Sequence, residues 1–283
     1  MTLTASRFLD PRADVVFKKV FGEHADLLIS FLNAVMPLTS PIRHITYLPS
    51  EQAPDIPELK RPIVDVRCED NDGRTFIVEM QMEWSAAFSK RILYTVSQAY
   101  VHQLNRGQSY KHLCPVYGLA LLNENCDDGA QWYHHYRLQH KEESHKTLDG
   151  VEIILLELQK FHPRNWEEKR LGVLWLRFLK EIMNCQTIPA EFEESPEIVK
   201  ACQLAQESAY SKAELRAYNE YWDAIQIERT LVEDGEDRGR AEGKAEGIAE
   251  VAKASIARGL DDETISAITC LTFVYVFWHF DVG

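Results

Sequence analysis

Residues 62–82 read PIVDVRCEDNDGRTFIVEMQM, and the fold assignment starts from this stretch. Two runs rich in β-branched and aromatic residues flank Asn-Asp-Gly at positions 71–73, which is a strong signal for a β-hairpin. We expect a three-residue loop with Gly73 in the left-handed conformation, because glycine adopts a positive φ at no steric cost. With that loop, Asp70 faces Arg74 across the turn.

The hairpin register decides which polar side chains share a face of the sheet. A three-residue loop places Asp65 directly opposite Glu79 and Ile63 opposite Gln81. A two-residue loop would send Asp65 to the other face, because strand side chains alternate. The sequence therefore predicts that Asp65, Glu79 and Gln81 lie on one side of the hairpin.

Asp65 and Glu79 would be cross-strand neighbours of like charge, a pairing that normally destabilises a sheet. A divalent cation relieves that repulsion, and hard cations such as Mg²⁺ bind carboxylate oxygens together with water and phosphate oxygens. The alternative is a solvated strand face on which two acids happen to pair. Spacing alone leaves both interpretations open.

Three further stretches accompany IVEMQ at 77–81: DVVFKKVFG at 14–22, RILY at 91–94 and QSYK at 108–111. Together with Asp65 they resemble the Rpn family of recombination-promoting nucleases, also labelled transposases, of the PD-(D/E)xK superfamily. The resemblance covers most of the chain. It implies an α/β fold with a restriction-endonuclease-like mixed sheet flanked by helices, followed by a helical C-terminal region.

The resemblance also implies a metal-dependent DNA endonuclease that hydrolyses phosphodiester bonds in recombination or mobile-element processes. Asp65 and Glu79 would hold Mg²⁺, or Mn²⁺ as the alternative ion, with the Met80 carbonyl as a third ligand. Gln81 stands where the superfamily usually has lysine; it would orient the attacking water, although an amide carries no charge and cannot act as a base. A nuclease fold that has lost catalysis and serves as a DNA-binding or interaction module is the alternative.

Further contacts to phosphate or water are expected from the first helix and from the helix after the hairpin. Asp14 and Lys18 lie four residues apart on one helical face, either at the rim of the site or as a surface ion pair. Arg91, Tyr94 and Gln98 follow the hairpin on a helix that the resemblance places beside the site; the alternative is a buried Tyr94 with solvated neighbours. Arginine is the strongest phosphate candidate of the three, because its planar fork matches two phosphate oxygens.

The 283-residue chain has a net charge of −13 and 45% hydrophobic residues, a composition sufficient for a buried core. The acidic balance argues against general affinity for nucleic acids, so a DNA-cleaving enzyme would have to gather its cations locally. The six cysteines form neither a Cys-x-x-Cys pair nor a Cys/His ligand cluster in the sequence, which indicates a reduced, cytoplasmic protein without a zinc site. We expect no signal peptide and no membrane span, because no apolar run is long enough.

Hydrophobic periodicity and turn residues predict the remaining elements. Helices are expected over 11–20 (capped by Asp10), 25–35, 86–104, 211–232, 248–257 and 262–268, with helical periodicity from 165 and a further helix start at 195. Strands are expected over 44–48, 115–123, 132–138 and 151–158. His134 and His135 would point to opposite faces of their strand, so we interpret them as ordinary strand histidines and not as a chelating pair.

These elements divide the chain into three parts. A nuclease-like core covers 1–162, a helical region covers 163–233, and a glycine-rich charged connector with a short helical tail covers 234–283. The aromatic run at 271–280 departs from the polar ending of the resembled family, and it suggests a frameshifted or truncated end.

Within the last part, glycine recurs every fourth residue from Gly235 to Gly247. Each glycine costs a helix about 1 kcal/mol relative to alanine, so a flexible connector is the favoured interpretation. The alternative is a glycine stripe that brings the C-terminal helices of two chains together in a homo-oligomer.

Overall fold

The computed structural model describes residues 7–51, 62–163 and 170–270 of the chain. Their contacts form two compact units, Met1–Trp222 and Asp223–Gly283. The boundary between the units falls within one long helix, α6 (Lys212–Ala257).

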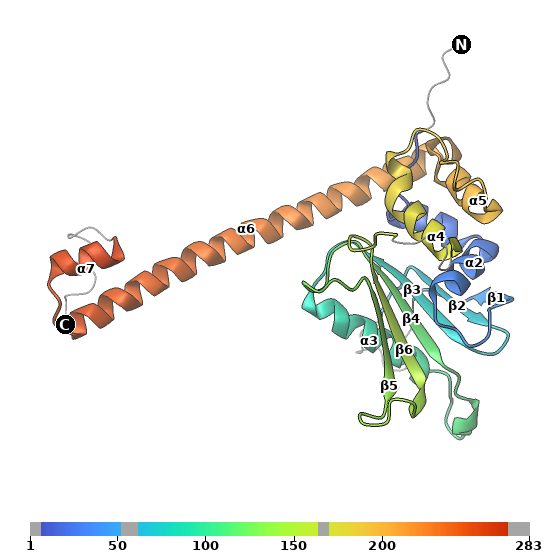
Figure 1. The fold of residues 1–283 in the computed structure, drawn as a ribbon, viewed down its shortest axis with the longest axis horizontal. Helices are drawn as coiled ribbons and strands as arrows, with labels where there is room; N and C mark the ends of the chain where they lie inside the picture. The colour runs from blue at the N-terminus through green and yellow to red at the C-terminus, as the bar shows by residue number, and fades with distance from the viewer. Residues whose placement is uncertain (1–6, 52–61, 164–169, 271–283) are drawn as a thin grey trace, which may run out of the picture. The chain divides into compact units, whose positions relative to one another are not determined.

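The first unit is built on one six-stranded mixed sheet with the strand order β1-β2-β3-β4-β6-β5 (Figure 1). The strands are β1 (Ile45–Tyr47), β2 (Val66–Asp70), β3 (Thr75–Gln81), β4 (Val116–Leu122), β5 (Tyr133–Gln139) and β6 (Thr147–Glu157). Strands β3, β4 and β6 run parallel to one another, whereas β1, β2 and β5 pair antiparallel with their neighbours. The predicted α/β fold with a mixed sheet is confirmed.

Helices pack on both faces of this sheet (Figure 1). The α-helices of this unit are α1 (Asp14–Phe17), which continues as a π-helix over Lys18–Gly22, α2 (Ala25–Val35), α3 (Ala86–Val101), α4 (Arg170–Glu181), α5 (Pro196–Ala205) and the start of α6; short 3₁₀ segments cover Tyr110–His112, Ile182–Asn184 and Glu207–Ala209. One hydrophobic cluster joins α1, α2, α4 and α5 to one face of the sheet, with the fully buried Trp175 packed among phenylalanine rings. A smaller cluster joins α3 to the other face through residues such as Phe88 and Ile92.

The hairpin between β2 and β3 has the predicted register. Val66 pairs with Val78, and the Asp70 amide donates to the Arg74 carbonyl at 3.0 Å. Gly73 has φ +77°, the left-handed conformation that the three-residue loop requires. The predicted pairing of Ile63 with Gln81 is wrong, because β2 begins only at Val66 and Ile63 forms a bridge with Glu51 instead.

The first helix begins later than predicted. It starts at Asp14 with Ala13 at the N-cap position, not after Asp10. The Asp10 carboxylate is engaged elsewhere, because it accepts hydrogen bonds from the backbone amide and the guanidinium of Arg12. The predicted cap at the start of α6 is confirmed: the Ser211 amide donates to Glu214 at 2.7 Å, and the Glu214 amide donates to the Ser211 hydroxyl at 3.3 Å.

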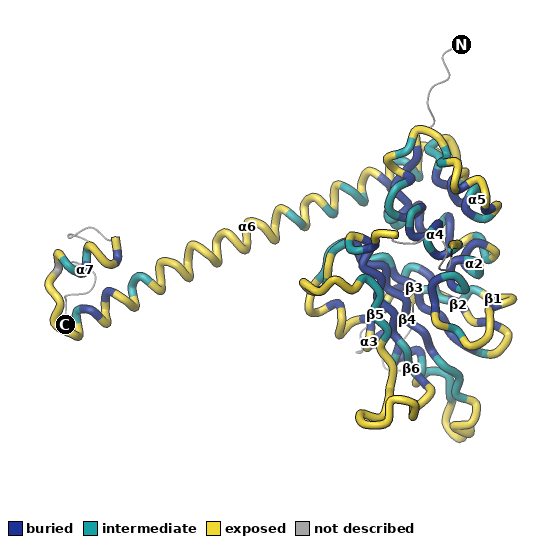
Figure 2. The backbone as a smooth tube through the Cα atoms, in the orientation of Figure 1, coloured by how far each residue is buried: buried dark blue, intermediate teal, exposed yellow. Residues whose placement is uncertain are grey.

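In the second unit, the predicted flexible connector is wrong, because α6 continues as a helix through the four glycines to Ala257. A methyl group added at Gly235, Gly239, Gly243 or Gly247 would meet no described atom within 4 Å, and most of this stretch is exposed (Figure 2). The intervening alanine, glutamate, lysine and arginine residues are strong helix formers, which offsets the cost of the glycines.

Gly259, with φ +73°, ends this helix as predicted, and α7 (Asp262–Thr269) follows, capped by Asp261. The predictions made for 271–280 lie outside the described residues. Within the described ranges, no helix combines the length and the apolar character needed to cross a membrane.

Candidate active site

Asp65 and Glu79 lie at the end of the β2–β3 hairpin that is distant from its turn. The pairing of Val66 with Val78 places Asp65, one residue before β2, opposite Glu79. Cβ atoms of directly opposed residues are about 4.5–5.5 Å apart. Asp65 Oδ2 accepts a hydrogen bond from the Met80 amide at 2.6 Å, so this carboxylate takes over the last backbone contact of the hairpin.

Both carboxyl groups are withdrawn from water, and Glu79 is only 5% exposed. Burial raises the pKa of Asp65 to about 6 and the pKa of Glu79 to about 7. The charge of Asp65 adds to the increase at Glu79, whereas the positive charge of Arg91 opposes it. Because the pKa values of both neighbouring acids are raised, the positive charge around Asp65 and Glu79 does not compensate two carboxylates.

Arg91 brings positive charge to this place from α3. Its Nη2 atom lies 3.3 Å from Glu79 Oε2 and 2.6 Å from Gln81 Oε1, and its guanidinium lies 4.9 Å from the centre of the Phe88 ring. Gln81 Nε2 donates to the Glu83 carbonyl at 2.6 Å. The Gln81 amide is therefore held at both ends, and Arg91 supplies the charge that this amide lacks. We refer to Asp65, Glu79, Gln81 and Arg91 as the hairpin site.

The Met80 carbonyl points toward the edge of β3 that borders β2, where Asp65 lies. The Asn123 amide donates to the Gln81 carbonyl at 2.9 Å, so that carbonyl points toward β4. Carbonyls alternate along a strand, and the amide and carbonyl of one residue point to the same edge, so the Met80 carbonyl points toward β2. Two carboxylates and one carbonyl are a donor set that fits a hard divalent cation such as Mg²⁺.

Asp14 and Lys18 form an ion pair, with Lys18 Nζ 2.8 Å from Asp14 Oδ1. Both charges act on Asp65: Asp14 raises its pKa and Lys18 lowers it. Tyr221, near the start of α6, is also within electrostatic reach, because burial and then the charges of Asp65 and Asp14 raise its pKa. The sequence did not single out Tyr221; the aromatic pattern YNEYW at 218–222 was the available signal.

The two other candidates on α3 are placed differently. Tyr94 is 42% exposed and lies one helical turn beyond Arg91. Gln98 is buried, and its Oε1 atom has no hydrogen-bond partner among the described residues. Gln98 lies seven positions after Arg91, which corresponds to about 10 Å along the helix axis. The structure therefore does not bring Gln98 together with the hairpin site.

The fold also assembles a second group of metal-ligating side chains, here called the Cys126 cluster: Cys126, Asp127, His134 and Glu157. Their ligand atoms lie within 4.8 Å of one another. The prediction that no cysteine belongs to a Cys/His cluster is therefore wrong, because the fold brings together residues from three separate parts of the chain. His134 and His135 do point to opposite faces, since His134 contacts Glu157 and His135 contacts Glu152.

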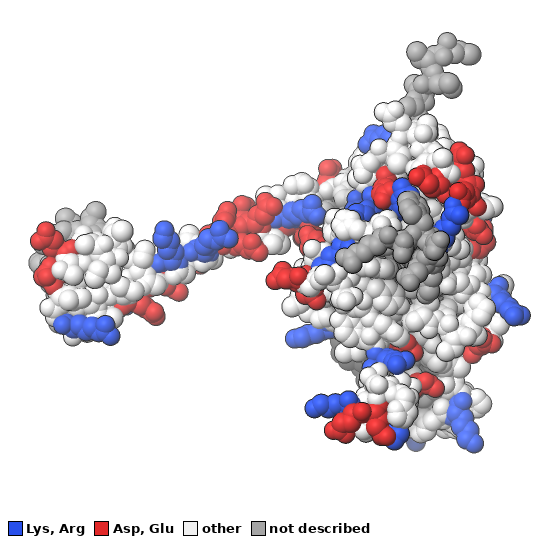
Figure 3. All heavy atoms as spheres, viewed as in Figure 1, with Lys and Arg blue, Asp and Glu red and all other residues white. Residues whose placement is uncertain are grey.

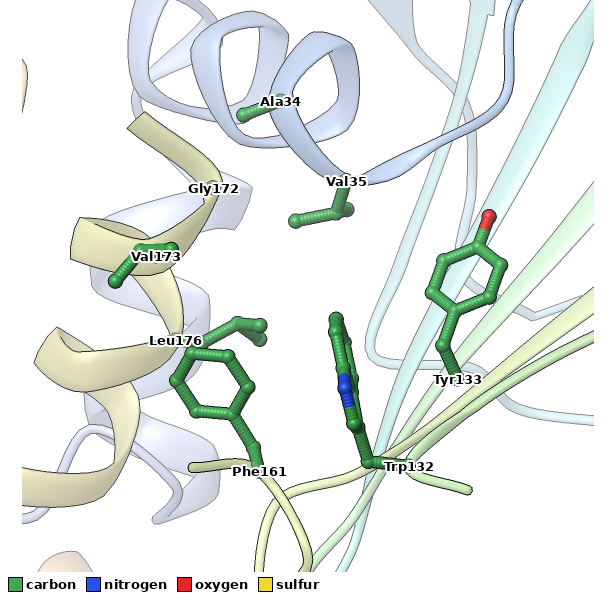
Figure 4. A pocket seen from close by; sticks show the side chains of 8 residues that line it. All are labelled: Ala34, Val35, Trp132, Tyr133, Phe161, Gly172, Val173 and Leu176. Carbon is green, nitrogen blue, oxygen red and sulfur yellow. The ribbon is translucent and has the colours of Figure 1, made fainter. Parts of the chain in front are cut away.

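An apolar pocket of about 500 Å³ lies between α2, α4 and the start of β5 (Figure 4). The residues that line it are Ala34, Val35, Trp132, Tyr133, Phe161, Gly172, Val173 and Leu176. This set offers neither a carboxylate nor a metal-ligating side chain. The pocket belongs to the helix-covered face opposite α3, so it is separate from the hairpin site.

The comparison with known families gives one match. Residues 11–232 match the family described as PD-(D/E)XK nuclease family transposase. Neither a curated protein nor a solved structure matches the chain. The matched range covers 222 of the 283 residues (232 − 11 + 1) and includes the whole hairpin site. The chain therefore belongs to the PD-(D/E)XK nuclease family of transposases.

Proposed function

We propose that this chain is a metal-dependent DNA endonuclease that hydrolyses phosphodiester bonds. Membership of the family supports a nuclease or transposase role. The observation that carries the proposal is the hairpin register, which places Asp65 opposite Glu79 and beside the Met80 backbone. Gln81 and Arg91 border the same position, so ligands, a water-orienting amide and a phosphate-binding cation are available at one strand end.

Asp65, Glu79 and the Met80 carbonyl would hold Mg²⁺, or Mn²⁺ as the alternative ion. When bound, such an ion polarises the scissile phosphate, lowers the pKa of a bound water and stabilises the leaving oxygen. The raised pKa values of the two acids support this assignment, because an added cation favours their ionised form.

Gln81 and Arg91 would share the work that the superfamily assigns to lysine. The Gln81 amide, fixed by Arg91 and by the Glu83 carbonyl, would orient the attacking water. An amide does not accept a proton, so a phosphate oxygen of the substrate would take it. Arg91 is exposed enough to bind a phosphate oxygen, and it favours ionisation of Glu79.

The rim of the site would guide the DNA backbone. Asp14 and Lys18 lie near Asp65, and Tyr94 is exposed beyond Arg91, whereas Gln98 is set apart. On the face seen in Figure 3, Lys and Arg are interspersed with Asp and Glu and do not form one extended basic surface. Local cations and a bound metal ion would therefore dominate DNA binding by this acidic chain.

The resemblance to the Rpn recombination-promoting nucleases supports a role in recombination or mobile-element processes. The six cysteines are all free, which fits the reducing cytoplasm that we propose as its location. Association through the C-terminal helices stays a prediction.

A plasmid-nicking assay tests this function. Supercoiled DNA should be nicked or linearised with Mg²⁺ or Mn²⁺ and remain intact with EDTA. Asp65→Asn removes a ligand charge at constant shape and should reduce cleavage by about 10³-fold, whereas Glu69→Gln, an exposed acid on the same hairpin, should keep it. Cleavage that persists in EDTA, or that proceeds at the wild-type rate in Asp65→Asn, would refute the assignment. A chain that shifts DNA without cutting it would support the alternative, a decayed nuclease fold that binds DNA.

A further inference from the structure

Three parts of the chain converge on the Cys126 cluster. Cys126 and Asp127 lie in the segment after β4, His134 lies in β5, and Glu157 is the last residue of β6. Glu157 is fully buried; its Oε1 atom lies 2.6 Å from His134 Nε2 and 3.1 Å from Cys126 Sγ. Cys126 Sγ lies 4.0 Å from His134 Nε2, and one Asp127 oxygen completes the group within 4.8 Å.

These separations are close to those of a tetrahedral zinc site. Zinc–ligand bonds of about 2.0–2.3 Å place tetrahedral ligand atoms about 3.3–3.8 Å apart. The observed separations lie on both sides of that range, so side-chain adjustments of less than about 1 Å would suffice. A thiolate, an imidazole and carboxylates favour Zn²⁺ over a hard cation such as Mg²⁺.

The geometry argues against a Cys-His-Glu catalytic relay. In such a relay, one ring nitrogen of the histidine faces the nucleophile and the other faces the acid. Here the same nitrogen, His134 Nε2, faces both Cys126 and Glu157.

Lys160 contacts two acids of the cluster and leaves Glu157 Oε1 available to bind an ion. Its Nζ atom lies 2.8 Å from Glu157 Oε2 and 2.7 Å from Asp127 Oδ1. The Cys126 amide also donates to Glu157 Oε2, at 3.0 Å. These contacts fix one oxygen of Glu157 and leave Oε1 directed at the thiol and the imidazole. Outer contacts of this kind orient the carboxylates that ligate metals.

We propose that Cys126, Asp127, His134 and Glu157 bind one Zn²⁺ ion in a site separate from the hairpin site. Leu122 of β4 pairs with Gln81 on one side and with Glu157 on the other. Glu157 is therefore two strands away from Gln81, or about 10 Å between backbones. Paired catalytic ions lie about 3.5–4 Å apart, so this zinc would not be a second catalytic ion.

The ion would have a structural task. It would tie the segment after β4 to β5 and β6, at the end of the parallel strands where β3 carries Glu79 and Gln81. Closed sites with four protein ligands are typical of structural zinc.

Metal analysis of the full-length protein tests this proposal. Protein equilibrated with Zn²⁺ and freed of loosely bound metal should retain about one zinc ion per chain. Replacement by Co²⁺ should give a thiolate-to-cobalt charge-transfer band. Cys126→Ser and His134→Gln should each lose most of the zinc and the band. His135→Gln, on the other face of β5, and Cys114→Ser should keep both, and so should Asp65→Asn at the hairpin site.

Three results would overturn the proposal. These are wild-type protein that retains no zinc, a cobalt spectrum without the thiolate band, and zinc retained unchanged by both Cys126→Ser and His134→Gln. If Cys126→Ser does not fold, as judged by circular dichroism, the wild-type cobalt spectrum and His134→Gln decide. The measurement does not depend on DNA cleavage, so it stands apart from the proposed nuclease function.

Discussion

Two buried glutamates, on parallel strands that are separated by β4, differ in their protonation. Glu79 at the end of β3 is 5% exposed, and burial raises its pKa to about 7. Glu157 at the end of β6 is 0% exposed, yet its pKa is lowered. Burial acts to raise that pKa too, but hydrogen bonds from Lys160, Cys126 and His134 outweigh it.

The difference teaches that the donors around a carboxylate decide its charge, and not its burial alone. Glu157 is compensated by groups of the chain itself, so the Cys126 cluster is assembled in advance. At Glu79, the like charge of Asp65 opposes ionisation, and the half-exposed Arg91 compensates it only in part. The hairpin site therefore has too little positive charge, and an added cation would supply it. The donor types also differ: carboxylate and carbonyl oxygens suit a hard cation such as Mg²⁺, whereas a thiol and an imidazole suit Zn²⁺.

The largest expected effect is a loss of DNA cleavage when the hairpin site is changed and the Cys126 cluster is left intact. Asp65→Asn should reduce metal-dependent DNA cleavage by about 10³-fold, because losing a ligand removes several kcal/mol of transition-state stabilisation at about 1.36 kcal/mol per tenfold. Initial nicking rates with Mg²⁺, measured beside the zinc content of the same sample, check this. The zinc content should not change. A joint loss of zinc and cleavage would show that the two sites are one unit.

The next effect concerns Arg91, which contacts Glu79 and Gln81 at the hairpin site. Arg91→Ala should lower cleavage by about 10- to 100-fold, since a charge-assisted phosphate contact is lost. Because Arg91 lowers the pKa of Glu79, its removal should also move the pH–rate profile to higher pH. Arg91→Lys should restore part of the rate but not all of it, because lysine lacks the planar fork. An unchanged pH profile in Arg91→Ala would exclude this role.

The free energy of unfolding should depend on pH in opposite directions through Glu79 and through Glu157. From about pH 4 to pH 7, the folded chain holds protons on Asp65 and Glu79 that the unfolded chain releases, so without divalent ions these groups lower the free energy of unfolding as the pH rises. At about 1.4 kcal/mol per pKa unit, each contributes on the order of 3 kcal/mol. Urea unfolding of Asp65→Asn/Glu79→Gln in EDTA should therefore show more stability than wild type at pH 8.

Glu157→Gln is the matched control for that experiment. Its lowered pKa stabilises the fold above about pH 4.5, the ordinary value for glutamate, and this contribution disappears as the pH falls through the folded pKa. Glu157→Gln should therefore be less stable than wild type at pH 8. Equal signs for the two sets of variants would contradict the contrast drawn between the sites.

The smallest effect tests the turn that sets the hairpin register. Gly73→Ala should cost about 2 kcal/mol, because φ is +77° and the new Cβ would lie 2.8 Å from Cys114 Sγ. Gly107→Ala is the control, since φ is +88° but no atom of the described residues lies within 4 Å of the new Cβ, so about 1 kcal/mol of strain remains. Urea unfolding compares the two. Equal losses would mean that the Cys114 contact is unimportant, and a loss of zinc in Gly73→Ala would contradict the separation of the sites.

The sequence was most informative where the relevant contacts are local. Asn-Asp-Gly fixed a three-residue loop, and the strand alternation then placed Asp65 opposite Glu79 within 15 residues of chain. The bounds of α2 and the cap of α6 were also readable, because periodicity and capping act over one or two turns. The predicted start of α1 was wrong because the Asp10 carboxylate binds Arg12 and does not cap the helix. The predicted connector was wrong because the helix-forming residues between the glycines of α6 outweigh the cost of the glycines.

The amino-acid sequence by itself thus determined the acidic hairpin and the α/β class of this protein. Only the tertiary structure placed Arg91 against Glu79 and Gln81, Tyr221 near Asp65, and Cys126 beside His134 and Glu157. Those contacts depend on the parallel order β3-β4-β6 and on how helices cross the sheet. No local pattern encodes that order, because the strands that meet are separated by long crossover segments whose packing is decided by the core as a whole.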